Sequence, residues 1–167
     1  APPLAIYHFS TKIINYSDLP LNAYSQVIYP QLIKAYRQFG LGDLKRKYAQ
    51  NIFRLLLMSI AISTMIFLFK GPIIKILSSN EYASAGTIIS ILLLSSLAKP
   101  WGRVFGLTLD AIGKPQINFQ MLAFSLVINV SMNIILVPIW GIIGAAFATV
   151  ISIYLTVIIG QFRINKI

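Results

Sequence analysis

The sequence predicts an all-α fold, a polytopic bundle of about five transmembrane helices within a single domain, 1–167. Hydrophobic residues make up 57% of the chain and charged residues only 11%, whereas a soluble globular domain carries about a quarter charged residues. So few polar residues cannot coat a soluble protein, and the apolar ones gather in runs long enough to cross a bilayer. The basic residues lie between these runs, as in a membrane protein.

The first two expected helices come before residue 78. The first covers 3–32, with Pro20 and Pro30 as kinks. The second covers 52–77, because its uncharged centre, 55–69, needs both flanks to reach the roughly 20 residues that span a bilayer.

Three more helices are expected after residue 83. The third covers 84–113 and the fourth covers 117–137, which Pro138 closes. The fifth covers 142–159 and ends before a short polar stretch with Arg163. Because residue 1 is Ala and the sequence starts inside an expected helix, we expect a longer chain.

The loops predict the orientation. The segment 34–54 carries six Lys or Arg against Asp43, and such an excess marks a cytoplasmic loop. Alternation then places 78–82 and 138–141 outside, and 113–116 and the C-terminus, with Arg163 and Lys166, inside. Lys70 and Lys75 fall near the outer end and depart from the rule. The expected location is the cell inner membrane.

Composition argues against several classes of function. The net charge is +10, but the bases are spread between apolar runs, so no nucleic acid partner is expected. The chain has one His, no Cys and four acids, of which no two lie at helical spacing. We therefore expect no catalytic carboxylate pair, no metal site and no cofactor, and the chain is not expected to be an enzyme.

The unusual feature is charge inside the third expected helix. If that helix is continuous, for about 45 Å, it puts Lys99 near the bilayer midplane, in a stripe with Arg103, Gly106 and Asp110. A charge that faces lipid costs at least about 2.5 to 3.5 kcal/mol. The two cations are therefore expected to face a wet cavity, where they suit an anion such as a phosphate or pyrophosphate.

A second interpretation of this stripe stays open. Pro100 lacks a backbone donor, and a helix that ended there would leave both cations as interfacial anchors. Against this, the run 83–98 alone spans poorly, and Ser95 or Ser96 could compensate the lost hydrogen bond.

Other polar residues also lie inside expected helices. Lys12, one turn after His8, is a further cavity candidate, or else both lie at a solvated end. Ser125, Asn129 and Asn133 share one helix face, where they either join helices or contact substrate. Small residues that allow close helix packing recur four apart, at Gly102 with Gly106 and at Gly144 with Ala148.

Short motifs follow one another along nearly the whole chain. They are 6–13, Tyr29-Pro30-Gln31-Leu32, Gly42-Asp43 before a basic stretch, Glu81-Tyr82-Ala83, Ala111-Ile112-Gly113-Lys114, Asn129-x-x-x-Asn133, and Pro138-Ile139-Trp140-Gly141-Ile142-Ile143-Gly144-Ala145-Ala146. In this order they resemble the polysaccharide-exporter branch of the multidrug/oligosaccharidyl-lipid/polysaccharide (MOP) flippase superfamily, and the last two are the most distinctive.

This resemblance implies a fold and a function. The chain would form most of the second lobe of a two-lobed bundle of about 12 to 14 helices that rocks around a central cavity. The implied substrate is an undecaprenyl-pyrophosphate-linked oligosaccharide, moved by alternating access for polysaccharide biosynthesis, such as that of O-antigen and lipopolysaccharide. The implied partners are this anionic lipid-linked oligosaccharide, membrane lipids and the missing N-terminal lobe.

Other functions would leave different marks on the sequence. A multidrug or cation antiporter of the same superfamily would use acidic residues in the membrane, and the intramembrane charge here is mainly basic. A membrane-embedded glycan polymerase or ligase would bring large external loops, whereas the expected external turns are short. A structural membrane subunit without transport activity stays open.

Overall fold

The computed structural model describes residues 2–77 and 85–164, in which every regular element is an α-helix. The helices are α1 (Pro3–Ser17), α2 (Leu19–Leu77), α3 (Ala85–Ala111) and α4 (Pro115–Ile164), so the all-α fold is confirmed. Three stretches are long and apolar enough to cross a membrane: Pro3–Ile76, Ala85–Ala111 and Pro115–Ile164. The expected outer turn 78–82 and Lys166 lie outside the described residues.

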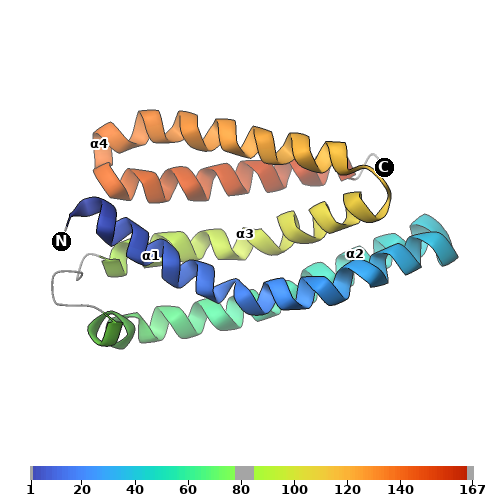
Figure 1. The fold of residues 1–167 in the computed structure, drawn as a ribbon, viewed down its shortest axis with the longest axis horizontal. Helices are drawn as coiled ribbons and strands as arrows, with labels where there is room; N and C mark the ends of the chain where they lie inside the picture. Colours follow the sequence, from blue (N-terminus) through green and yellow to red (C-terminus); the bar gives the residue numbers. More distant parts are fainter. Residues whose placement is uncertain (1, 78–84, 165–167) are drawn as a thin grey trace.

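The helix count differs from the expected five. The described residues contain four helices, and α2 and α4 each double back on themselves (Figure 1). They reverse at Gly40, with φ 75°, and at Gly141, with φ 57°, a left-handed conformation that residues with a Cβ rarely adopt. Because helix resumes directly after one glycine, two expected helices can belong to a single element.

The basic segment 34–54 is not the expected loop. It is helical on both sides of Gly40. Its Lys, Arg, Leu and Gln residues are good helix formers, and one glycine is enough to reverse the chain, so this segment needs no loop.

The expected first helix, 3–32, is interrupted at Asp18, where α1 ends and α2 begins. Pro20 accounts for the break, because its ring crowds the carbonyl four residues earlier and is tolerated only in the first turn of a helix. The Asp18 N–H instead donates to the carbonyl of Asn15 at 3.1 Å. Pro30 lies inside α2 without ending it.

The central helix is α3, which contacts α1, α2 and α4. Its Ile88, Ile89 and Leu92 are buried in one apolar cluster that includes residues of α1. Val104 is buried in a second cluster with residues of α2. Many large apolar side chains on α2 and α4 stay exposed, as expected for faces that meet lipid, so α3 is the helix most enclosed by protein.

Pro100 does not end α3, which confirms the continuous helix and makes the interpretation of an end at Pro100 wrong. The missing N–H leaves the carbonyl of Ser96 without its helical partner. The Ser59 hydroxyl of α2 donates to that carbonyl at 2.5 Å, whereas the Ser95 hydroxyl donates to the Leu92 carbonyl at 2.6 Å. The compensation therefore comes from a neighbouring helix, not from Ser95 or Ser96.

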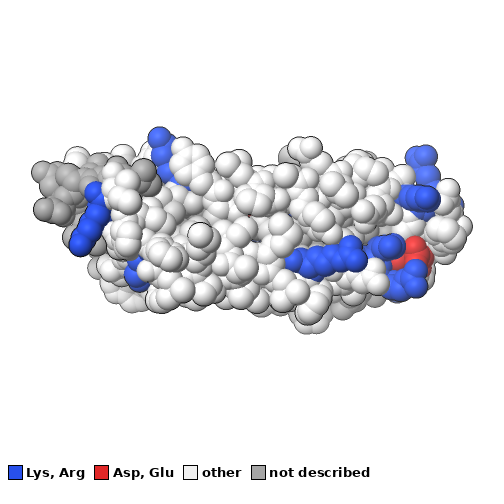
Figure 2. All heavy atoms as spheres, turned by 90° about the horizontal axis from the view of Figure 1, so that it is seen from below, with Lys and Arg blue, Asp and Glu red and all other residues white. Residues whose placement is uncertain are grey.

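The turns sort to the two ends of the long axis (Figure 1). The reversal at Gly40, the turn at Gly113 and the end of α4 lie at one end, and the start of α1 and the reversal at Gly141 lie at the other. The described turns thus alternate between the two ends, as the sequence predicted, whereas the side of the membrane that each end faces stays a prediction. Figure 2 shows Lys and Arg gathered most densely near the Gly40 end, with a broad stretch free of them in the middle.

Candidate functional site

A polar cavity of about 500 Å³ lies between the first half of α2, the second half of α3 and both halves of α4. Its polar lining residues are Asn22, Ser25, Lys99, Arg103, Asp110, Asn118, Ser125 and Thr156. Gly102 and Gly106 form part of the α3 wall. Because these two glycines lack side chains, residues of α4 can come close to the backbone of α3 at these positions.

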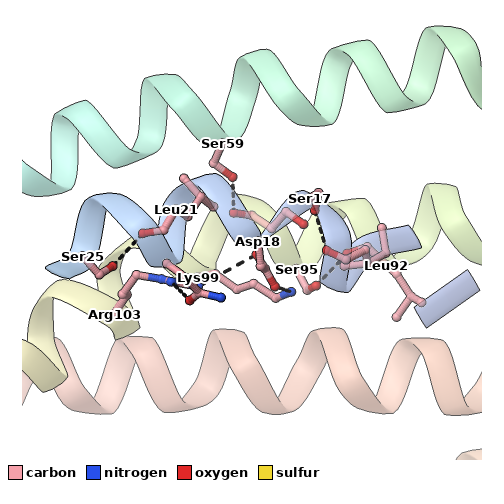
Figure 3. A network of polar contacts seen from close by, with 12 residues as sticks. Ser17, Asp18, Leu21, Ser25, Ser59, Leu92, Ser95, Lys99 and Arg103 are labelled. Carbon is pink, nitrogen blue, oxygen red and sulfur yellow. Dashed lines mark hydrogen bonds and ion pairs between the residues drawn. The ribbon is translucent and has the colours of Figure 1, made fainter. Parts of the chain in front are cut away.

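Lys99 is paired with Asp18, the residue at the break between α1 and α2 (Figure 3). Lys99 Nζ lies 2.7 Å from Asp18 Oδ2, and only 20% and 14% of the two side chains are exposed. A charge inside the membrane needs such a partner, because facing lipid alone is costly. The carboxylate therefore neutralises Lys99 in this structure.

Arg103 has a different partner. Its Nη1 donates to the amide oxygen of Asn22, one turn beyond Asp18 on α2. Its Nη2 is 4.0 Å from Asp18 Oδ1, which is too far for a hydrogen bond. Among the described residues, that carboxylate oxygen is buried and has no hydrogen-bond partner. The guanidinium is thus held by a neutral amide, while Lys99 takes the carboxylate.

Asp110 lines the same cavity two turns further along α3. The Asn118 amide of α4 donates to its two carboxylate oxygens at 3.2 and 3.3 Å. This amide lies against Gly106, where an added Cβ would be 3.0 Å from Asn118 Oδ1. The cavity region therefore holds two cations and two acids, and only one cation is within hydrogen-bond distance of an acid.

Of the three cations expected in a cavity, the structure brings two together. Lys99 and Arg103 line this cavity side by side. Lys12 and His8 are exposed on α1 and are not part of its lining. The sequence predicts the stripe on α3 because a charge inside the membrane is costly. The same argument applies less well to Lys12, because a solvated end of the chain was the alternative expected there.

The polar face of the fourth expected helix divides between two roles. Ser125 lines the cavity. Asn129 instead donates to the Ser152 hydroxyl in the other half of α4 at 3.3 Å, and Asn133 donates to the Asn129 carbonyl at 2.8 Å. Asn129 therefore joins the halves of α4, which was one of the two expected roles of this face, whereas Asn133 donates to Asn129 within the first half.

Sequence reasoning missed Asp18, Asn22 and Asn118. Asp18 and Asn22 lie one turn apart, so a helix brings both to one face. An acid two residues before Pro20 is also a helix-start signal. These signals predict a helix start, but only the packing of α2 against α3 shows that the two side chains meet Lys99 and Arg103.

A second pocket, of about 520 Å³, is lined mainly by apolar residues of α2, α3 and α4. Lys45 is the charged residue in its lining. Beside it, the Tyr48 hydroxyl donates to the Gln161 side chain at 2.7 Å. Since this pocket gathers no set of charged groups, the polar cavity is the candidate site.

Comparison with known proteins gives relatives of much greater length. The chain is 33% identical over 99 residues to an uncharacterised membrane protein of Methanocaldococcus jannaschii, over 59% of this chain and 20% of that protein. It is 24% identical over 146 residues to a probable low-salt glycan biosynthesis flippase of Haloferax volcanii, over 87% of this chain and 31% of the relative. It is 25% identical over 156 residues to the capsular polysaccharide biosynthesis protein CapF of Staphylococcus aureus, over 93% and 39%.

A solved structure shares the fold. It is the outward-facing conformation of a multidrug resistance MATE family transporter of the MOP superfamily, with a TM-score of 0.87 and 18% identity over 98% of this chain and 39% of that one. Here too the chain spans well under half of its counterpart. The long apolar helices show that the chain is a multi-pass membrane protein. The MatE family model matches residues 40–135, more than half of the chain, and the chain therefore belongs to the MatE family.

Proposed function

We propose that this chain is part of a transporter that carries a lipid-linked oligosaccharide across a membrane by alternating access, without chemical change. Lys99 and Arg103 bind the anionic headgroup of that lipid. The observation that carries the proposal is their position, one turn apart on a membrane-spanning helix and in the wall of a polar cavity. The names of the relatives from Haloferax volcanii and Staphylococcus aureus, a flippase and a capsule biosynthesis protein, support it.

The chemistry of the two cations suits a pyrophosphate. The planar guanidinium of Arg103 matches two phosphate oxygens at once, and the ammonium of Lys99 adds a compact charge. Ser25, Ser125 and Thr156 in the same lining offer hydroxyl groups for further hydrogen bonds. We propose an undecaprenyl pyrophosphate carrier, with its glycan in the aqueous space and its isoprenoid tail in lipid.

The chain acts as one lobe of a larger protein in this proposal. It spans at most 39% of the length of the relatives given above, so a second lobe would supply the opposite wall of the transport pathway. The two lobes would rock against each other around the site. The basic end, with the reversal at Gly40 and the turn at Gly113, would face the cytoplasm of a cell inner membrane.

A second candidate is export of organic cations. Asp110 lines the cavity, and the neutral amide of Asn118 donates to its carboxylate. This amide does not neutralise the carboxylate, which could therefore bind a cation. The structural neighbour is itself a multidrug resistance transporter. In this case Asp110→Asn would abolish resistance to a cationic dye, whereas Arg103→Ala would not.

Substitution of Arg103 in the complete transporter tests the main proposal. Arg103→Ala is expected to abolish the surface glycan of cells that depend on the transporter, because an uncompensated cation is lost from the cavity. Arg103→Lys is expected to restore only part, since charge is kept and the bidentate geometry is lost. The measurements are surface glycan by immunoblot and transporter abundance in the membrane fraction.

Arg163→Ala is the matched control. Arg163 is exposed at the end of α4 and donates to Gln120, so its loss should leave surface glycan unchanged. Normal surface glycan in the double variant Lys99→Ala/Arg103→Ala, at normal abundance, would overturn the proposal.

A further inference from the structure

We propose that Asp18 is a built-in counter-ion that the anionic headgroup must displace, so that Asp18 sets how tightly the cavity holds its ligand and how readily it releases it. This inference rests on the proposed function, because it concerns the same cavity. In this inference Asp18 competes with the ligand for Lys99, whereas Asn22 holds Arg103 without neutralising it.

The first step is the asymmetry of the two cations. Lys99 is in full contact with the carboxylate of Asp18, at 2.7 Å. Arg103 is 4.0 Å from the other carboxylate oxygen and donates to the amide oxygen of Asn22. A neutral amide leaves the charge of Arg103 uncompensated at contact distance. Arg103 therefore has more positive charge to offer an incoming anion than Lys99 has.

The second step concerns Lys99, which serves either Asp18 or the anion. An ammonium within hydrogen-bond distance of a carboxylate has little charge left to offer a second anion. A phosphate oxygen placed on Lys99 would also lie beside Asp18, and like charges in close contact repel each other strongly at an interface. Full engagement of both cations therefore requires the Asp18 carboxylate to move away from Lys99.

The third step is that Asp18 is placed where it can move. It lies at the break between α1 and α2, outside both helices. Figure 3 shows it between Lys99 and Arg103, reaching across from the break to α3. Its Oδ1 is buried without a hydrogen bond among the described residues, so only one of its oxygens is fastened. A side chain held by one hydrogen bond, with Arg103 at the longer distance of 4.0 Å, is released more readily than one whose two oxygens are both hydrogen-bonded.

Removing the charge of Asp18 should therefore separate binding from transport. In Asp18→Asn, Lys99 is free to join Arg103 on the ligand, and binding tightens. Release then slows, because no counter-ion returns to replace the departing anion, and transport falls. A residue that only holds the fold together would weaken both binding and transport.

Calorimetric titration of the complete transporter in detergent with farnesyl pyrophosphate, a short isoprenyl pyrophosphate, tests this inference. Asp18→Asn is expected to bind the probe about tenfold or more tightly than the parent protein, while surface glycan in cells falls. Asp18→Ser gives the same test through a smaller uncharged side chain if the Asn variant is poorly recovered. Asp18→Glu keeps the charge and should gain no affinity.

Two other acids serve as controls for the change from carboxylate to amide. Asp43 is paired with Arg46 at 2.6 Å on α2, just beyond the reversal at Gly40. Asp43→Asn should leave the affinity within about twofold of the parent, because Asp43 is not part of the lining of the polar cavity and its partner Arg46 is exposed. Asp110→Asn removes the other acid of the cavity without touching Lys99. A gain from Asp110→Asn as large as that from Asp18→Asn would overturn the inference, because cavity charge in general would then account for it.

The same titration separates this inference from the proposed function. If Lys99→Ala/Arg103→Ala binds farnesyl pyrophosphate as tightly as the parent, the proposed function fails. If that double variant loses binding while Asp18→Asn binds no more tightly than the parent, the proposed function stands and the role of Asp18 as a counter-ion is wrong.

Discussion

Three polar groups on α3 find their partners outside that helix: the Ser96 carbonyl, Lys99 and Arg103. Pro100 withholds a backbone donor, and the hydroxyl of Ser59 on α2 takes its place at the Ser96 carbonyl. Lys99 and Arg103 are likewise held by Asp18 and Asn22. In a bilayer core no water is available to make up such deficits, so each of these three polar groups on α3 depends on the identity of one residue elsewhere in the chain.

Ser59→Ala tests this dependence. The substitution removes the donor to the Ser96 carbonyl and is expected to destabilise the complete protein by about 1 to 2 kcal/mol, because a buried acceptor is left unsatisfied. The measurement is reversible unfolding in mixed detergent micelles. Ser131→Ala is the control, since the Ser131 hydroxyl is exposed and donates only to the Val127 carbonyl within α4. Equal stability of the two variants would show that Pro100 needs no compensation.

At the scale of elements, the main feature is that α2 and α4 each reverse direction at one glycine. Helix α4 folds back at Gly141, and its halves then pack so closely that a Cβ on Gly144 would overlap the backbone carbonyl of Leu136. Asn129 and Ser152 tie the same halves together further along. The small-residue pair at Gly144 and Ala148 therefore marks close packing inside one hairpin.

Gly144→Ala should destabilise this hairpin. The neighbouring atoms are backbone and cannot turn aside, so we expect a loss of about 1 to 3 kcal/mol, typical of overpacking, seen as a lower midpoint of thermal unfolding in detergent. Gly42→Ala is the matched control, because a Cβ there meets nothing within 4 Å and alanine favours a helix by about 1 kcal/mol over glycine. A Gly144→Ala protein as stable as Gly42→Ala would contradict the close approach.

The sequence predicted the apolar spans better than the turns between them. Hydrophobic length identifies a span because bilayer thickness sets it, and the cost of charge in lipid led to Lys99 and Arg103. The same reasoning missed the reversals at single glycines, which local backbone conformation decides. It predicted a kink at Pro20, where the structure has a break between two helices. The partners Asp18 and Asn22 lie 81 residues from their cations, and no local pattern links positions so distant.

At the scale of the whole molecule, the Lys and Arg residues outside the polar cavity are distributed unequally between the two ends. The segments that meet at the end with the reversal at Gly40, which are 34–47, 113–114 and the end of α4, carry seven Lys or Arg residues, whereas the segment 70–75, toward the other end, carries two. This asymmetry matches the rule that basic residues stay on the cytoplasmic side. It predicts that the end with the reversal at Gly40 faces the cytoplasm.

Single cysteines in the complete transporter test that orientation, because the described chain has none of its own. Asp43→Cys and Lys114→Cys are expected to react with a membrane-impermeant maleimide only after the inner membrane is permeabilised. Trp140→Cys, at the opposite end, should react in intact cells, since Trp140 is 54% exposed beside the reversal at Gly141. Labelling of Asp43→Cys in intact cells would show that the predicted orientation in the membrane is wrong.

The hairpin of α4 also bears on how the chain enters the membrane during synthesis. Between Lys114 and Arg163 there is no charged residue, and the reversal at Gly141 is made by one non-helical glycine. In the proposed orientation, the segment that crosses the bilayer first is therefore an uncharged turn with an apolar helix on each side. Both halves can leave the insertion machinery together as a preformed pair, with their backbone hydrogen bonds already made before either meets lipid.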